Sequence, residues 1–298
     1  MAMYRNMEEF TAFSLALTAI WMRNLVIDSA VQEFYNIKST TKPVVRTQNL
    51  GSFGLVPEHK KGGITYVDVD PGDRKEFYVR RLTDGLRIPQ DFIEDDEYDV
   101  VEEMITDHAL SFQRTVTYDM AEPFNTMFST TKYTAADGRA LCSTGRNSGK
   151  AVLNNKGTSP LTHDNVVATR KLMRQFKDSN GLILQVRPDT IVVPVGLEDK
   201  ADEITQSVNR SDNATNASNF NRSLRYKVEP LLDDQNDWAL IDSVLAKRHL
   251  RWWWRIMPDF KTDPKSMYDL ELRTRGTMRY VNGFDDHIWI YGHEVADS

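Results

Sequence analysis

The chain has 298 residues, of which 40% are hydrophobic, so it can form a substantial core, and a prior of roughly one domain per 150 residues gives two structural units. Its 43 acidic and 37 basic side chains leave a formal net charge of −6, which argues against a protein that grips nucleic acid phosphates through a general excess of Lys and Arg. Cys142 is the single cysteine, which excludes an intrachain disulfide and a zinc site of several thiolates and fits a cytoplasmic protein.

The N-terminal region predicts a short amphipathic helix over residues 8–27. Apolar side chains recur there at helical spacing, and they include Phe10, Phe13, Leu17, Ile20 and Trp21. The most apolar stretch, residues 13–22, is shorter than the roughly 20 residues that a membrane helix needs. Glu8 and Glu9 stand where a signal peptide carries positive charge, so we expect neither a membrane anchor nor secretion.

The next segment predicts an extended arm followed by a hairpin. Residues 38–63 are rich in Lys, Thr, Gly and Ser without a clear period, which is typical of an arm or a mobile loop. Residues 64–69 and 76–82 predict two strands, and Asp70-Pro71-Gly72-Asp73 between them carries turn residues. A two-stranded ribbon is only marginally stable alone in water. We therefore expect the hairpin to lie on a neighbouring molecule, which is a first indication of assembly.

An acidic run precedes a predicted long helix. Residues 91–103 contain eight acids and no base, namely Asp91, Glu94, Asp95, Asp96, Glu97, Asp99, Glu102 and Glu103. From Val101 to Val116 apolar residues recur at three- and four-residue intervals, which predicts a helix from about Asp95 to Tyr118 or beyond. Acids in its first turns suit the helix dipole and need no metal. Pro123 is expected to end or kink the helix.

The middle of the chain predicts an α/β layer. Residues 134–160 are rich in Gly, Asn and Ser and predict a second loop region. A helix is expected from Thr162, its predicted cap, until Asn180-Gly181 stops it. Strands are expected over residues 182–186 and 191–194, and a helix over 197–207. Alternating strands and helices of this kind indicate an α/β layer.

The late part of the chain is predicted to be mostly β, after a polar surface excursion over residues 209–222. Strands are expected over residues 224–232, 238–242, 249–257, 268–275 and 287–291. Within the third of these strands, Trp252 and Trp254 share one face and Trp253 takes the other. Tryptophan beside arginine can stack nucleic acid bases. A strand buried on both faces, or one at a subunit contact, is the favoured interpretation.

No motif predicts catalysis, a metal or a cofactor. Residues 145–151 resemble a phosphate-binding loop, but three residues separate the glycines where four are needed, and Ala151 stands where a Ser or Thr should be. The acidic run lacks the spacing of a calcium loop. The six histidines form no helical zinc pair. Asp285, Asp286 and His287 are a possible acid/base cluster, although three polar residues beside a glycine are more often a turn.

Two short segments flank the predicted long helix: residues 93–98, with sequence IEDDEY, lead into it, and residues 137–143, with sequence DGRALCS, follow it. They resemble the acidic start of the long spine helix and the loop after that helix in the Mu-like major head subunits, a group within the Hong Kong 97-type capsid proteins of tailed bacteriophages. The match is best from Leu161 through Phe176–Gly181 and residues 191–194 to Ala201. The motifs are individually weak, but their order and spacing are specific, and the resemblance covers roughly residues 60–207.

The resemblance implies an α+β fold of the Hong Kong 97 type and a major capsid protein that is not an enzyme. Subunits of this family form hexamers and pentamers of an icosahedral shell that encloses phage double-stranded DNA. The implied segments are an N-terminal arm with a short helix (1–37), an E-loop region (38–90), a P-domain spine helix (91–132), an A-domain (133–265) and C-terminal P-domain strands (266–298). Many relatives begin with a cleaved scaffolding segment, whereas amphipathic sequence starts here at once. Either the segment is absent and scaffolding is a separate protein, which Met1 favours, or the chain is the mature form. The other expected partners are a portal, packaged DNA bound without sequence specificity and, as a further candidate, a decoration protein. Assembly is expected in the host cytoplasm, and the assembled protein is expected in the virion capsid.

Two groups of residues are predicted to make contacts between subunits. The basic residues Lys60, Lys61, Arg74 and Lys75 of the hairpin are expected to meet the acids Glu94, Asp95, Asp96 and Glu97 on the next subunit. Trp252 and Trp254 are the other candidates. Two alternatives stay open: an encapsulin-like compartment that holds enzyme cargo, and a soluble α/β hydrolase that uses Asp286 and His287.

Overall fold

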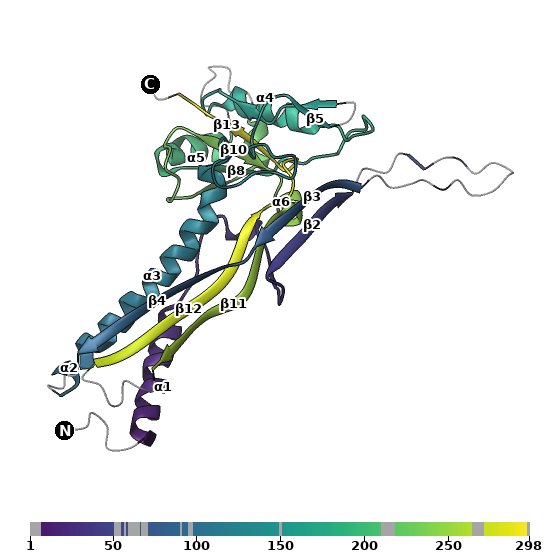
Figure 1. Cartoon of the computed structure of the whole chain (residues 1–298). Coiled ribbons are helices and arrows are strands. Elements are labelled where there is room, and N and C mark those ends of the chain that lie inside the picture. The colour runs from purple at the N-terminus through teal and green to yellow at the C-terminus, as the bar shows by residue number, and fades with distance from the viewer. Residues whose placement is uncertain are drawn as a thin grey trace.

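Two β-sheets, each covered by helices, make up most of the computed structural model (Figure 1). The structure describes residues 7–50, 55–56, 58, 66, 71–89, 91–94, 98–148, 151–209, 218–263 and 271–296. The mixture of helix and strand agrees with the α+β class predicted from the sequence.

The first sheet has four strands in the order β1-β11-β12-β4. Their bounds are β1 Asn36–Ser39, β11 Leu250–Thr262, β12 Glu271–Phe284 and β4 Arg80–Pro89. Strands β11, β12 and β4 are antiparallel, and β1 joins β11 in parallel. Helices α1 (Met7–Asn24) and α3 (Tyr98–Asn125) lie together on one face of this sheet (Figure 1). The other face is free of helices in the described part of the chain.

Helix α1 is part of the body and not a free arm. Its predicted apolar stripe is confirmed, because Phe10, Leu17 and Trp21 are buried. The indole N–H of Trp21 donates to Nδ1 of His108 in α3 (3.2 Å), and its ring stacks on Phe260 of β11 at 5.5 Å between centroids. These contacts fix α1 to both the helix and the sheet, and such aromatic pairs add to the stabilisation that burial itself gives.

The predicted long helix is confirmed as α3, which has 28 residues and is about 42 Å long at 1.5 Å per residue. A short helix, α2 (Asp91–Glu94), precedes it. Pro123 does not end α3, which continues to Asn125. Proline has no N–H to bond the carbonyl of Asp119 one turn earlier. The side chain of Asn282 donates to that carbonyl instead, so the helix keeps its hydrogen bonding and is joined to β12.

The second sheet has five strands in the order β7-β13-β10-β8-β9. Their bounds are β7 Lys156–Gly157, β13 Ile290–His293, β10 Trp238–Ile241, β8 Thr190–Val193 and β9 Arg225–Val228. Helices α4 (His163–Arg174) and α5 (Glu198–Gln206) accompany it, and the predicted cap is confirmed because the Thr162 hydroxyl accepts from the amide of Asn165. The predicted α/β layer is therefore present.

Shorter elements connect these layers. They are α6 (Ser243–His249), the single helical turns η1 (Gln32–Phe34), η2 (Val195–Leu197) and η3 (Phe220–Ser223), and the small hairpin of β5 (Arg146–Ser148) and β6 (Ala151–Leu153). The end of α3 reaches the second sheet, so the two layers share one apolar core in which Phe124 meets the ring of Trp289.

The predicted hairpin exists, but its strands differ from those expected. Strand β2 (Val44–Leu50) pairs with β3 (Pro71–Tyr78), from Val44 opposite Tyr78 to Leu50 opposite Pro71. The predicted turn at 70–73 is wrong, because Pro71, Gly72 and Asp73 lie in β3. Proline is tolerated at the first residue of a strand. Residues 64–69 lie outside the described residues apart from Tyr66.

The structure corrects several other predictions. Residues 182–186 form no regular strand, because Gln185 has a φ of 54° and Ile183 makes only an isolated bridge. Residues 134–160 contain three short strands, and residues 38–63 contain β2. The excursion at 209–222 ends in buried Asn219 and Asn221. Helix α6 was not predicted at all. The predicted boundary at residue 265, between the A-domain and the C-terminal P-domain strands, does not match the two sheets. Strand β11, which ends before it, lies beside β12 in the first sheet, whereas β13, which follows it, belongs to the second sheet.

Candidate functional site

Lys75 fixes the β2–β3 hairpin to the body of the subunit. Its ammonium donates to the carbonyl oxygens of Phe284 (2.7 Å) and Thr134, and it lies over the rings of Phe77 and Phe284. Lys75 was predicted to reach acids on another subunit, but these contacts engage it within its own chain. Arg74, the next residue on β3, is exposed. Of the two predicted contacts on β3, Arg74 is therefore the one left to reach a neighbour.

The buried position of Lys75 predicts a pH dependence of subunit stability. Burial lowers the pKa of Lys75 from 10.5 to about 8, so the folded chain releases this proton before the unfolded chain does. The contribution of Lys75 to the free energy of unfolding should therefore be lowest below pH 8 and rise up to pH 10.5. Over this window the free energy of unfolding of the wild type should increase, relative to that of Lys75→Met, by at most about 3 kcal/mol. Chemical unfolding of dispersed subunits at several pH values measures it. Lys75→Arg, which stays charged throughout, should lack the rise, and a wild-type curve parallel to it would contradict the assignment.

The tryptophans of β11 lie inside the subunit. Trp252 is fully buried and stacks on Tyr280 at 4.5 Å between centroids, and Trp254 packs against the same ring. Trp253 faces the other side, where it contacts Phe77 of the hairpin at 5.0 Å. The interpretation of a strand buried on both faces is thus the one that the structure supports. Trp252 and Trp254 are thus buried within their own subunit, and the structure gives no support to the contact between subunits predicted for them.

The acidic residues after β12 form ion pairs instead of a recognisable catalytic group. Asp285 is 3.0 Å from Nδ1 of His249 and accepts both Nε and Nη2 of Arg251 (3.0 and 2.9 Å). Burial alone would raise the pKa of Asp286, but the hydrogen bond and charge of His287 lower it to about 2. Asp286 is therefore ionised near neutral pH and cannot act there as a general acid. Nδ1 of His287 lies 3.1 Å from Asp286, but its Nε2 is buried and has no hydrogen-bond partner among the described residues, so no nucleophile completes the pair that the hydrolase alternative needs.

The described residues of the segment that resembles a phosphate-binding loop lie mainly in β5 and at the start of β6, and the next element in the described chain is the strand β7 and not a helix. Arg146 within it is 2% exposed and donates to the Ser143 hydroxyl (3.0 Å) and to the carbonyl of Ala140. Burial raises the pKa of the Cys142 thiol to about 12. A buried thiol of this kind is inert, because the thiolate is the reactive form.

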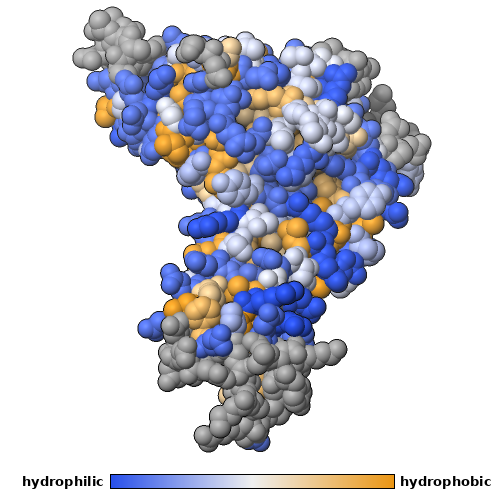
Figure 2. Space-filling view, turned by 60° about the vertical axis from the view of Figure 1, so that its left-hand side comes forward, coloured by the Kyte–Doolittle hydropathy of each residue, from blue (hydrophilic) through white to orange (hydrophobic). Residues whose placement is uncertain are grey.

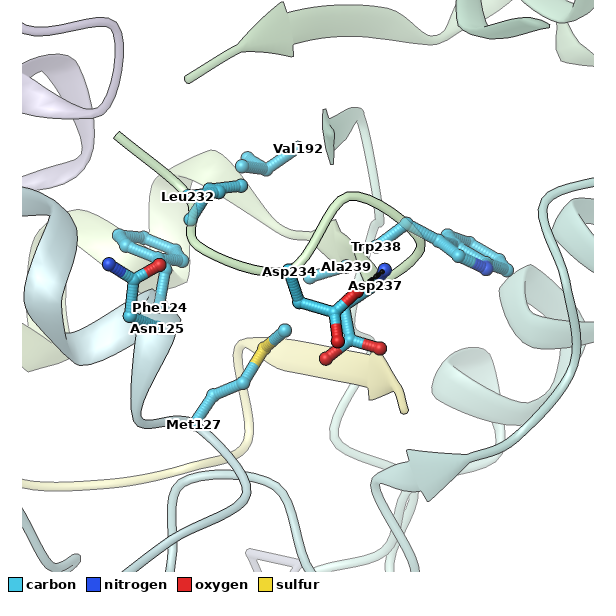
Figure 3. Close-up of a pocket in the computed structure, with 9 residues that line it drawn as sticks. All are labelled: Phe124, Asn125, Met127, Val192, Leu232, Asp234, Asp237, Trp238 and Ala239. Carbon is cyan, nitrogen blue, oxygen red and sulfur yellow. Dashed lines mark hydrogen bonds between the residues drawn. The ribbon is translucent and has the colours of Figure 1, made fainter. Parts of the chain in front are cut away.

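A small cavity lies between the end of α3 and the second sheet (Figure 3). Phe124, Asn125 and Met127 line it from the side of α3, and Val192 and Ala239 line it from β8 and β10. Its volume of about 20 Å³ holds little more than one water molecule. This is far below the several hundred Å³ of a typical small-molecule site, so the cavity marks the junction between the two layers and not a substrate pocket.

Arginines crowd the helix-free face of the first sheet, a feature that the sequence analysis missed. We call this surface the arginine face: Arg81 and Arg87 of β4, Arg255 of β11, and Arg273, Arg275 and Arg279 of β12. In the strand register, Arg279 lies opposite Arg81 and Arg273 opposite Arg87. The alternate residues of β12, such as Met278 and Tyr280, are buried under the helices. The signal in the sequence was the pair Arg273 and Arg275, which stand two residues apart in the predicted strand over 268–275 and therefore share one face.

Few acids balance the arginine face. Arg273 pairs with Glu271 at 3.6 Å. Within the described ranges of the chain, the other five arginines of the face have no acidic partner. Burial lowers the pKa of Arg279, and the neighbouring charges of Arg255 and Arg81 lower it further. Nε of Arg279 is buried without a hydrogen-bond partner in the described structure. Apart from Arg273, the face therefore holds positive charges close together that pair with no acidic side chain in the described chain.

Several predicted contact residues lie outside the described residues, namely Lys60, Lys61, Asp95, Asp96 and Glu97. Glu94 is the last residue of α2. Within the described parts of the chain, no group of three metal-ligating side chains comes together. No helix in those same parts is both long and apolar enough to cross a bilayer.

Comparisons with known proteins give a consistent result. A family model described as phage capsid protein matches residues 75–291. No curated protein matches the chain. Among solved structures, a chain of Microbacterium phage Oxtober96 is 12% identical with a TM-score of 0.54, covering 90% of this chain and 91% of that one.

Two further structures extend this similarity. The capsid of Myoviridae Phage XM1 is 12% identical with a TM-score of 0.53, covering 92% of this chain and 98% of that one. A virus-like particle from Pyrococcus furiosus is 9% identical with a TM-score of 0.57, covering 95% and 99%. At such low identity these structures show a common fold over almost the whole length of each chain.

Proposed function

The chain belongs to the phage capsid protein family and has the Hong Kong 97-like fold of a major capsid protein that forms the shell, and we propose that its subunits assemble as hexamers and pentamers. The observation that carries this proposal is the β2–β3 hairpin. It is a separate two-stranded sheet: the end that holds Phe77 packs on Trp253 of the first sheet, and the opposite end points away from both larger sheets (Figure 1). Such a ribbon is marginally stable alone, and a neighbouring subunit supplies the surface that it lacks.

The proposed parts of the subunit follow the two layers. The first sheet with α3 serves as the P-domain, the second sheet with α4 and α5 as the A-domain near the capsomer axis, and β2–β3 as the E-loop. Hexamers and pentamers form through A-domain contacts, and each E-loop laps over an adjacent subunit. Segments that bury surface only on a neighbour become ordered on assembly, which makes closure of the shell cooperative.

The proposed role as a shell protein implies partners other than the subunit itself. The shell encloses double-stranded DNA, which it contacts without sequence specificity, and a separate scaffolding protein and a portal direct assembly in the host cytoplasm. A decoration protein is a further possible partner. The subunit has no catalytic role and needs no cofactor. The inert thiol of Cys142 and the unpartnered Nε2 of His287 in the described structure support this view.

Electron microscopy of the purified protein tests the proposal directly. Light scattering should show particles far larger than a small oligomer, and negative-stain images should show uniform polyhedral shells or rings of five or six subunits. A stable monomer or dimer at every salt concentration, with scaffolding protein co-expressed, would overturn the proposed function.

Charge reversal at Lys60 and Lys61 is expected to have a modest effect on assembly. We expect Lys60→Glu combined with Lys61→Glu to lower shell yield and salt resistance, because both lysines meet Glu94–Glu97 of the next subunit in this proposal. Each exposed pair contributes only about 0–1 kcal/mol, so the effect depends on repetition around the shell. Shell yield by sedimentation at increasing salt measures it. Lys42→Glu, an exposed base before β2, is the matched control, and equal effects of both changes would count against the contact.

An encapsulin-like compartment is the second candidate, because a virus-like particle from Pyrococcus furiosus has the same fold. It has less support, since the matching family model describes phage capsid proteins. Mass spectrometry of purified shells separates the two. An enzyme enclosed at constant stoichiometry would favour the compartment, and its absence together with a portal at one vertex would favour the phage head.

A further inference from the structure

The second sheet carries bases at one end and acids at the other. Strand β8 runs from Thr190 to Val193, β9 is parallel to it and β10 is antiparallel. The segments before β8 and after β10 therefore meet at one end of the sheet, and the segments after β8 and before β10 meet at the opposite end. We call the first the basic end, with Arg170, Arg174 and Arg187, and the second the acidic end, with Glu198, Asp199, Asp233 and Asp234.

A cleft of about 480 Å³ opens at the basic end, and all three of its arginines line it. Arg170 is held in place because its guanidinium donates to the carbonyl of Phe220 (3.0 Å) and to the hydroxyl of Ser223 (2.9 Å). Its Nε is buried and has no hydrogen-bond partner among the described residues. Burial lowers the pKa of Arg170, and the charge of Arg174 lowers it further. The cleft thus presents positive charges that are already oriented.

No carboxylate within the described residues neutralises these arginines. Asp189 is the acid that lines the cleft, but it already accepts from Arg225 (3.3 Å) and from the amide of Ser243 (3.0 Å). Gln185, which also lines the cleft, has a φ of 54°. Residues other than glycine rarely adopt this conformation, and such positions are concentrated at binding sites. The cleft therefore has the properties of a site for an acidic partner.

The acidic end presents exposed carboxylates, namely Glu198, Asp199, Asp233 and Asp234. Two of them begin α5, and two belong to the loop between β9 and β10. The amide of Gly196 donates to the side chain of Gln235 (3.0 Å), which holds the two segments side by side. In the described part of the chain, none of the four carboxylates forms an ion pair. They are therefore free to meet cations from another molecule.

The two ends point in opposite directions within one layer of the subunit. The amide of Arg187 donates to Asp242, the cap of α6 (2.7 Å), so α6 starts at the basic end, and α5 starts at the acidic end. In Figure 1, α5 lies to the left of β8 and β10, and α6 lies to their right. Copies placed side by side can thus bring one basic end against the next acidic end. Such heterologous contacts close into rings when the rotation between copies allows it.

The surface on the side of α5 suits a polar contact. Figure 2 turns the left-hand side of Figure 1 toward the viewer, and hydrophilic residues interrupt the apolar areas there. Each end also exposes one apolar side chain: Phe220, beside the cleft, is 77% exposed, and Val195, just before α5, is 50% exposed. Arginine and aromatic residues are enriched at protein interfaces, so both ends have the composition of an interface between proteins.

We propose that the basic end of one subunit binds the acidic end of the adjacent copy in the same ring. The inference rests on the proposed shell function and names a contact that joins its A-domains. Arginine suits this contact, because its planar guanidinium binds a carboxylate through two parallel hydrogen bonds. Every copy supplies one end of each kind, so a ring of five and a ring of six both close without an unmatched end.

Charge reversal in the full-length chain tests the proposal. The first variant carries Arg174→Glu and Arg187→Glu, and the second carries Glu198→Lys and Asp233→Lys, all at exposed positions. Each variant alone should lower the yield of shells about tenfold or more, because like charges then face each other. A chain with all four changes should recover shells, because its two reversed ends attract again. Glu103→Lys with Asp107→Lys, at two exposed acids of α3, is the matched control and should keep the yield within about twofold of wild type, since exposed charges away from a contact contribute little.

A 1:1 mixture of the two variants gives a result that is specific to a contact between unlike ends. The first variant is negative at both ends and the second is positive at both, so only alternating copies attract each other. Alternation closes a ring of six but not a ring of five. Negative-stain images of the mixture should therefore show six-membered rings and no closed shells, because an icosahedral shell also needs rings of five.

The outcomes separate the inference from the function on which it rests. Wild-type chains that form neither rings nor shells would overturn the proposed function. Wild-type shells together with normal yields for both variants would overturn the inference alone. A folded chain with all four changes that does not recover would do the same, as would closed shells from the mixture or an equal loss in the control.

Neutral substitutions keep the proposal testable if a reversed chain does not fold by circular dichroism. Arg174→Gln with Arg187→Gln, and Glu198→Gln with Asp233→Asn, should each lower the yield of shells and reduce its dependence on salt, because salt screens the charges that these changes remove. A yield that depends on salt as strongly as that of the wild type would overturn the inference.

Discussion

Replacement of Trp252 by Ala should destabilise the isolated subunit by about 3–5 kcal/mol, because it opens a large cavity where the core cannot collapse. Trp252 is fully buried between Tyr280, which stacks on it, and Tyr35, whose ring meets it edge to face at 5.9 Å. The residue also lies on the strand that joins β1 to β12. Urea unfolding of dispersed subunits, followed by circular dichroism, measures the loss.

Trp252→Phe is the matched control. It keeps an aromatic ring against Tyr280 and removes an indole N–H that has no hydrogen-bond partner in the described structure. We expect it to cost less than half as much as the alanine change, since an aromatic side chain still fills most of the space. A loss below about 1 kcal/mol for Trp252→Ala would contradict the packing described for β11, given the usual cost of such changes.

Replacement of Asp119 by Ala should cost about 2–4 kcal/mol, because it leaves a buried donor and a partly buried cation without their partner. Asp119 of α3 accepts hydrogen bonds from Arg80 of β4 and from the hydroxyl of Tyr280 on β12. Burial and the nearby Asp119 raise the pKa of Tyr280, so this hydroxyl stays a donor. The lower end of the range applies if water reaches Arg80, whose side chain is 38% exposed.

A double-mutant cycle tests whether Asp119 acts through Tyr280. Tyr280→Phe removes only the hydroxyl and should cost about 1 kcal/mol. Together with Asp119→Ala it should cost less than the sum of the two single changes, because both remove the same hydrogen bond. Additive losses, measured by the same urea unfolding, would show that the two side chains do not interact. Asp119→Asn, which keeps an oxygen for Tyr280, should lie between the wild type and the alanine variant.

Local patterns in the sequence predicted the elements that are built from neighbouring residues. The stripe from Phe10 to Trp21 predicted α1, and the recurrence from Val101 to Val116 predicted α3, because one helix face packs on one core. Thr162 predicted the start of α4, since a cap needs only the amides of the next turn. These features depend on contacts within a few residues.

Pairing between distant segments was not predictable in the same way. The residues at 70–73 have the local chemistry of a turn, yet β3 begins among them because its partner β2 lies more than twenty residues earlier. Residues 182–186 are apolar enough for a strand, but the positive φ of Gln185 prevents regular pairing there. The arginine face was missed because it becomes a surface only when β4 and β12 lie side by side. The sequence of a single strand shows which side chains share a face, but it does not show which residues of the neighbouring strand lie opposite them.

The position of β13 has a consequence for how the subunit is made. This strand is formed by residues 290–293 and lies inside the second sheet, between β7 and β10. The first sheet likewise joins β1, near residue 36, to β11 beyond residue 250. A nascent chain that is still on the ribosome therefore lacks strands that both sheets need. A chain that stops before residue 250 lacks strands of both sheets, so we expect that it can complete neither.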